Sequence, residues 1–209
     1  MIETSDPSPF LEAEFLLVPP LPRTWFRTAD GHGLVQLQRD RFVYNWKRES
    51  PQDGDYPSYD SVIVGFERLW AEFGRFVARE QLGELVARQF ELVYVNVVPR
   101  SSIPEGDPVL VDHAPKPSNR FLPNPESFVW RTSYPLPEDR GRLHVVASTA
   151  RATPSGDPIL KLDLTARGIG NAAADEMRYW FDMAHQWIVS GFADVTTESM
   201  QRNVWGRKA

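Results

Sequence analysis

The side chains of this sequence that are best suited to chemistry are polar groups set within apolar stretches. Asn96 shares a predicted strand face with Tyr94, and His185 lies on the apolar stripe of a predicted helix. A buried polar group costs free energy unless it forms hydrogen bonds, so these groups either satisfy one another or point into a cavity. A cavity between sheet and helix would hold a small apolar ligand through its walls and a few polar contacts. The ligand-binding candidates are therefore Asn96, Tyr94, His185 and Trp130.

The sequence lacks the motifs that catalysis or metal binding would need. It contains no cysteine, which excludes disulfides, thiolate nucleophiles and cysteine-based metal sites. No two of its four histidines share a ligand spacing, and no nucleophile-elbow pentapeptide occurs. Gly168 and Gly170 precede a helix, but a lone glycine pair is better interpreted as a turn than as a phosphate loop. We therefore expect no catalytic residue, no cofactor and no metal, and keep an enzyme assembled from scattered residues as an alternative.

One segment carries the pattern of a single-stranded nucleic-acid site, in which cations alternate with aromatic side chains. The surface basic candidates there are Arg39, Arg41, Lys47 and Arg48. The same aromatics are better used as the buried face of a hairpin, with the charges on its rim and outer face. The formal net charge of −5 also gives the whole chain no general attraction for a polyanion. Nucleic-acid binding is therefore the weaker hypothesis.

Length and composition are those of an ordinary globular chain. The 209 residues suffice for one substantial core, and 42% of them are hydrophobic and 24% charged. A run of about 18 apolar residues, as a membrane span would need, does not occur. Residues 1–9 are polar and acidic and lack the features of a signal peptide, so the cytoplasm is the expected location.

The elements expected to position these groups begin with strands at 10–18 and 24–28. Residues 34–46 then predict a hairpin, because that register places the large apolar side chains on one face. Its tip is Arg39-Asp40, and its opposed pairs are Leu37 with Phe42 and Val35 with Tyr44. A long amphipathic helix is predicted to follow, capped by Ser58 and ended by Gly83.

The second half of the sequence repeats this order. Residues 88–98 predict a strand that is apolar on both faces, which is typical of a central position in a sheet. A proline-rich loop at 103–125 follows it. The strands expected after this loop are 128–134, 142–149 and 159–166. Asn171 is expected to cap a second long helix, and Thr196 to cap a short final helix that Gly206 closes.

This order of strands, helix, strands and helix predicts an α+β fold rather than a doubly wound α/β fold. We expect one antiparallel sheet covered by two long amphipathic helices, in a helix-grip or TATA-binding-protein-like arrangement. Residues 1–209 would form a single domain. Its first part, 10–83, would supply strands and a long helix, and 84–209 would supply strands, a long helix and the short C-terminal helix.

Several short motifs, taken in order from about Pro19 to the end of the chain, resemble those of a sporadically distributed bacterial protein family without an assigned activity. In the first half they are Pro20-Leu21-Pro22-Arg23-Thr24-Trp25-Phe26, Gln36-Leu37-Gln38-Arg39-Asp40-Arg41-Phe42 and Asn45-Trp46. In the second half they are Tyr94-Val95-Asn96, Ala184-His185, Phe192, Thr196-Thr197 and Trp205-Gly206. The resemblance implies a bacterial, cytoplasmic protein.

Members of that family begin with a further strand and helix that this sequence does not match. One part of the sheet is therefore expected to lack its cover, and exposed apolar sheet surface is often an interface. We expect a non-enzymatic binding or interaction module, set in a bacterial defence or stress locus. Its partner would be a second copy, another protein, or a small apolar ligand held between sheet and helices.

Overall fold

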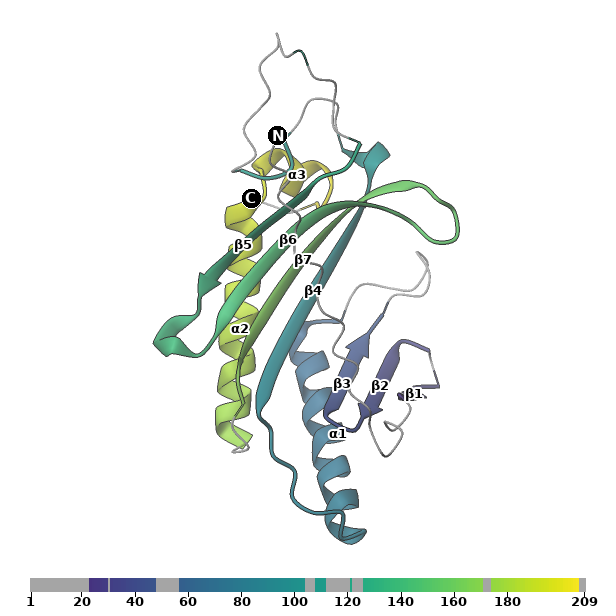
Figure 1. Ribbon diagram of the computed structural model, residues 1–209, viewed down its shortest axis with the longest axis vertical. Coiled ribbons are helices and arrows are strands. Elements are labelled where there is room, and N and C mark those ends of the chain that lie inside the picture. Colours follow the sequence, from purple (N-terminus) through teal and green to yellow (C-terminus); the bar gives the residue numbers. More distant parts are fainter. Residues whose placement is uncertain are drawn as a thin grey trace, which may run out of the picture. The chain divides into compact units, whose positions relative to one another are not determined.

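The strands and helices of the chain form an α+β fold, as predicted (Figure 1). The computed structural model describes residues 23–29, 31–47, 57–103, 108–111, 121, 126–170 and 174–206. Their strands belong to two antiparallel sheets instead of the one expected, and each sheet lies in one of two compact units, Met1–Leu82 and Gly83–Ala209. The predicted strand 10–18 and the cap Asn171 lie outside the described residues. The single-domain and helix-grip predictions stay predictions.

The sheet of the first unit has three strands in the order β1-β2-β3. These strands are β1 (Thr24–Arg27), β2 (Gly33–Gln38) and β3 (Arg41–Trp46). The predicted hairpin register is confirmed, since Leu37 pairs with Phe42 and Val35 pairs with Tyr44. Because side chains alternate along a strand, this register gathers the large apolar groups of β2 and β3 on one face.

Helix α1 (Tyr59–Arg79) packs on that face of the small sheet. Its N-terminus is the predicted one, because the Ser58 side chain accepts a hydrogen bond from a backbone N–H of the first turn. The Phe42 ring of β3 is the centre of an aromatic cluster with the helix. Its centroid lies 5.9 Å from that of Phe66, 5.4 Å from that of Trp70 and 5.4 Å from that of Phe73.

The C-terminus of α1 differs from the prediction that Gly83 ends it. The helix ends at Arg79, and Gln81 takes the left-handed conformation with φ +54°. The Gln81 N–H bonds to the Ala78 carbonyl (3.2 Å), and the Leu82 N–H bonds to the Val77 carbonyl (3.0 Å). This is a Schellman motif, which satisfies the last helical carbonyls with whichever residue follows the cap, glycine or not.

The sheet of the second unit has four strands in the order β4-β7-β6-β5. They are β4 (Gln89–Pro99), β5 (Val129–Pro135), β6 (Arg142–Arg151) and β7 (Pro158–Ile169). The prediction of a central position for 88–98 is wrong, since β4 is an edge strand among the described residues. Val93, Val95 and Val97 alternate with inward side chains but face outward, where they are 44%, 54% and 53% exposed. Because these outward valines are apolar, the edge strand has the same sequence pattern as a strand that is buried on both faces.

The core of the second unit lies between this sheet and helix α2 (Ala174–Val195). Alternate residues of β6 and β7 point inward and are almost fully buried, as are residues on the facing side of the helix. The sheet contributes Leu143, Val145, Ala147, Leu160, Leu162 and Leu164, and the helix contributes Trp180, Ala184 and Ile188. We call this face of the sheet the inner face, and the opposite one the outer face.

The final helix is α3 (Glu198–Asn203), and its cap differs by one residue from the prediction. Thr197 caps it, and the hydroxyl of Thr196 instead donates a hydrogen bond to the Phe192 carbonyl (2.6 Å). The helix ends at Asn203, three residues before Gly206. Within the described ranges, no helix combines the length and apolar character that crossing a membrane requires.

Candidate functional site

The predicted ligand-binding residues come from β4, β5 and α2, and two of them form a direct contact. The Tyr94 hydroxyl and the Nδ1 atom of His185 are hydrogen-bonded at 2.9 Å, which links β4 to α2. Their ring centroids lie 5.9 Å apart. Each of the two polar groups is therefore a partner for the other in the space between strand and helix.

Asn96 lies one inward position beyond Tyr94, and its amide donates a long hydrogen bond (3.4 Å) to the Leu162 carbonyl. Trp130 lies on the same cross-strand row as Asn96, but on the other edge of the sheet. Three strand spacings separate them, which is roughly 14 Å. The structure thus brings Asn96, Tyr94 and His185 together and leaves Trp130 apart.

The surroundings of this cluster are densely apolar. Leu162, Leu164 and Ala184 are fully buried beside it. The hydrogen bond between Tyr94 and His185 is what internal satisfaction of buried polar groups requires. Binding of a ligand by these residues stays a prediction.

One of the basic candidates, Arg41, lies in a strand of the first sheet, and its side chain is on the face opposite Phe42 and Tyr44. Phe42 and Tyr44 point toward α1, whereas Arg41 alternates to the other face. Arg39 lies in the exposed turn, and Lys47 follows the end of β3. Arg48 lies outside the described residues. The pattern of cations between aromatics is therefore split by the pleat of the strand.

Sequence reasoning did not find the outer face of the four-stranded sheet. Along β4 this face presents Val93, Val95 and Val97, all about half exposed. The signal was present in the sequence as the alternation of these valines with Tyr94 and Asn96. It was interpreted as a strand covered on both sides, because alternation alone does not tell which face another element covers.

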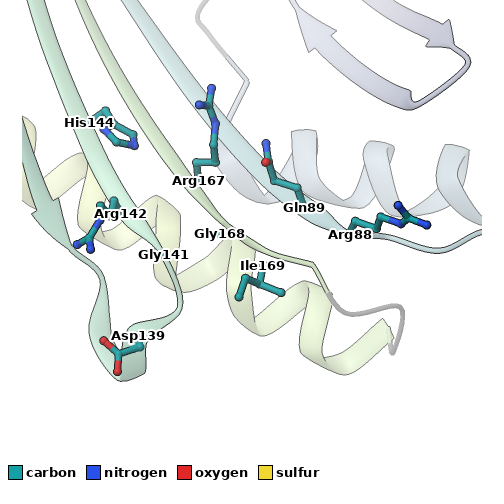
Figure 2. A pocket seen from close by; sticks show the side chains of 9 residues that line it. All are labelled: Arg88, Gln89, Asp139, Gly141, Arg142, His144, Arg167, Gly168 and Ile169. Atoms are coloured by element: carbon teal, nitrogen blue, oxygen red, sulfur yellow. The ribbon is translucent and has the colours of Figure 1, made fainter.

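A pocket of about 390 Å³ opens at one end of this sheet (Figure 2). It lies where β4 and β6 begin and β7 ends. Basic side chains dominate its lining, and Asp139 is the acidic residue among those that line it; the basic ones are Arg88, Arg142, Arg167 and His144. The three arginines are far apart in the sequence, so only the strand register brings them to one place.

Two of the basic groups of the pocket already have partners. The Arg167 guanidinium forms an ion pair with Glu91 on β4 (2.6 Å), and His144 Nδ1 is hydrogen-bonded to the Ser133 hydroxyl (2.8 Å). Among the described residues, Arg88 and Arg142 form neither an ion pair nor a side-chain hydrogen bond. Two guanidinium groups therefore keep their donors available at this pocket.

The rim of the pocket is fixed to helix α2 by Arg140. Its guanidinium pairs with Glu176 of α2 (2.9 Å) and with Glu138 of the short helix η2 (Pro137–Asp139; 2.9 Å). These hydrogen bonds, with Glu176 the larger contributor, raise the pKa of Arg140 above its usual value. The Arg140 carbonyl also accepts a hydrogen bond from the Trp180 indole (3.0 Å).

Comparisons with known proteins assign no family to this chain. No family model, no curated protein and no solved structure matches the chain. The resemblance to a bacterial family therefore stays a prediction, and any functional conclusion depends on the residues described above.

Proposed function

We propose that this chain is a non-enzymatic interaction module that associates with a partner strand along β4. The observation that carries the proposal is an eleven-residue edge strand with three half-exposed valines on its outer face. A sheet edge presents unpaired backbone donors and acceptors, which template the addition of another strand. The partner we favour is a second copy of the chain.

The composition of β4 supports strand addition. Natural edge strands are commonly short or carry lysine, proline or a bulge, which discourages pairing with another chain. Residues 92–98 instead contain no charged residue and no proline, and valine occupies four of these seven positions. Pro99 and Glu91 border this stretch. The edge therefore lacks the usual protection where it is most apolar.

A second copy fits this edge because the stretch is self-complementary. Antiparallel pairing of two β4 strands about Val95 would place Val93 of one copy opposite Val97 of the other. Glu91 would lie opposite Pro99, so no like charges would face each other across the pair. Such an isologous contact has the two-fold symmetry of most protein dimers. The valines of both copies would form one continuous apolar row.

The test of this proposal is the Val95→Lys variant. A lysine in the centre of the edge places two like charges opposite each other in the paired state, so we expect the dimer to dissociate. Because the Val95 side chain is 54% exposed, the fold itself should lose little stability. Light scattering on the purified chain would measure the molar mass of both forms.

The matched control is Val129→Lys on β5, the other edge strand of the same sheet. Val129 is 68% exposed and points to the same outer face, so this variant makes the same chemical change away from β4. It should remain a dimer. A wild-type chain that stays monomeric at the highest attainable concentration would overturn the proposal, as would equal dissociation of the two variants.

A small apolar ligand between β4 and α2 is the second candidate. Because the Tyr94 hydroxyl and His185 Nδ1 satisfy each other, such a ligand would have to replace their hydrogen bond with its own polar contacts. We propose the bacterial cytoplasm as the setting of either function, on the strength of the motifs from Pro19 to Gly206.

A further inference from the structure

We infer that the arginine pocket at the end of the four-stranded sheet binds the phosphate group of a small phosphorylated ligand. The residues that carry the inference are Arg142, Arg167 and Arg88. This site is separate from the valines of β4 and does not depend on self-association of the chain. Guanidinium groups are the preferred protein partners of phosphate, because their planar donors match pairs of phosphate oxygens.

The first argument is the position of two arginines directly opposite each other. Arg142 on β6 and Arg167 on β7 are partners in the antiparallel register, and both point to the outer face. Like charges at opposed positions destabilise a sheet. Glu91 neutralises Arg167 from the other side, but Arg142 has no acidic partner in the described part of the chain. Figure 2 shows the guanidinium groups of Arg142 and Arg167 turned away from each other.

An anion bound between these strands would neutralise Arg142, whose charge no acidic side chain of the described residues balances. It would accept hydrogen bonds from Arg142 without breaking the ion pair between Arg167 and Glu91. Arg88 lines the pocket from the segment before β4, and Figure 2 shows its guanidinium turned away from Arg142 and Arg167. This guanidinium is free of protein partners among the described residues, so its donors are available to a ligand. The pocket therefore offers more positive charge than the protein itself neutralises.

The second argument is that the backbone around the pocket is fixed before any ligand arrives. Gly141 has φ +135°, and a Cβ at this position would collide with the Arg167 backbone. A Cβ on Gly168 would collide with the Arg140 carbonyl and with the Trp180 indole. Both glycines thus permit a close approach of the turn, β7 and α2, and a rigid frame lowers the entropy cost of binding.

The third argument concerns the size and borders of the pocket. A volume of about 390 Å³ lies at the small end of the range for small-molecule sites. Asp139 lies on one side of the pocket, and the net charge of the chain is −5, both of which disfavour a long polyanion. Ile169 is 81% exposed at the rim and offers an apolar surface to the organic part of the ligand.

The experiment is calorimetric titration of the full chain with inorganic pyrophosphate at fixed ionic strength. We expect saturable binding to the wild-type chain and a loss of affinity of about ten- to a hundredfold in Arg142→Gln and in Arg88→Gln. Both side chains are exposed, so thermal melting should confirm that the variants fold. The matched control is Arg131→Gln, which removes an exposed arginine from the same outer face on β5, outside the pocket. It should bind like the wild type.

Three further ligands decide the source of the phosphate: phenyl phosphate, inorganic phosphate and a short oligonucleotide. Phenyl phosphate should bind at least as tightly as inorganic phosphate, because its ring can contact Ile169. Weaker binding of phenyl phosphate would overturn the assignment to an organic ester. A short single-stranded oligonucleotide should bind no more tightly than pyrophosphate. Three outcomes would each overturn the inference. They are no binding of pyrophosphate to the wild-type chain, a loss of affinity in Arg131→Gln as large as that in Arg142→Gln, and binding of the oligonucleotide alone.

Discussion

Tyr94 and His185 illustrate how a single hydrogen bond joins a strand to the helix that covers it. The bond is 2.9 Å long and lies among apolar side chains, where an unpaired donor or acceptor is costly. Beside it, Asn96 depends on a longer bond of 3.4 Å to the β7 backbone. These polar groups, which the sequence marked as ligand-binding candidates, therefore contribute to the stability of the second unit.

The variant Tyr94→Phe tests this contribution. Removal of the hydroxyl leaves His185 without this partner, and we expect a loss of about 1–3 kcal/mol in the free energy of unfolding. Urea denaturation followed by circular dichroism would measure it. The control is Tyr134→Phe on β5, because the Tyr134 hydroxyl has no hydrogen bond among the described residues. Equal losses in the two variants would contradict the role assigned to the Tyr94 hydroxyl.

At the scale of elements, the end of α1 shows that a helix can stop without glycine. Gln81 adopts φ +54° in a Schellman motif, and this left-handed conformation is unfavourable for a residue with a Cβ. The two hydrogen bonds that end the helix offset the conformational cost of this residue. Gln81 thus occupies a backbone conformation that glycine would adopt at a lower energy.

The variant Gln81→Gly should therefore stabilise the chain, by up to about 1 kcal/mol, since glycine adopts this conformation without strain. The expected readout is a higher melting temperature in differential scanning calorimetry. Gln81→Ala keeps the Cβ and serves as the control, with a change near zero. A destabilising effect of the glycine would show that the Gln81 side chain contributes more than its strain costs.

The sequence was informative where local pattern decides structure. The hairpin register follows from the alternation of Val35, Leu37, Phe42 and Tyr44, and the start of α1 follows from Ser58. It was misleading for β4. A strand with apolar side chains on both faces has the same sequence pattern whether or not another element covers its outer face.

The arginine pocket was beyond sequence reasoning for a different reason. Arg142 and Arg167 are 25 positions apart in the sequence and meet only because β6 pairs with β7 in one particular register. Arg88 joins them from the segment just before β4, the strand that neighbours β7. A one-residue slip of that register would move the partner of Arg142 to the opposite face.

At the scale of the whole molecule, the chain consists of two units joined between Leu82 and Gly83. The first unit has a three-stranded sheet with α1, and the second has a four-stranded sheet with α2 and α3. Leu82 and Val86, which lie at and just after the boundary, are 65% and 60% exposed. An exposed connection between compact units is where proteases cut first.

Limited trypsin digestion should therefore cut first at the arginines that flank the boundary. Arg79 and Arg88 are both exposed, and cleavage at either of them would release two fragments that match the two units. Mass spectrometry would identify the ends of the fragments. Early cleavage at Arg142 or Arg167, within the strands of the second sheet, would contradict a division at this boundary.

The edge strand β4 also affects how the chain behaves before it has folded. Residues 92–98 form an uncharged, valine-rich stretch of the length found in the spines of amyloid fibrils, where identical segments stack in register. While the second unit is incomplete during synthesis or after heating, β7 does not yet cover one side of this stretch, and other chains compete for it. The strand that we propose for association is thus also a hazard for aggregation.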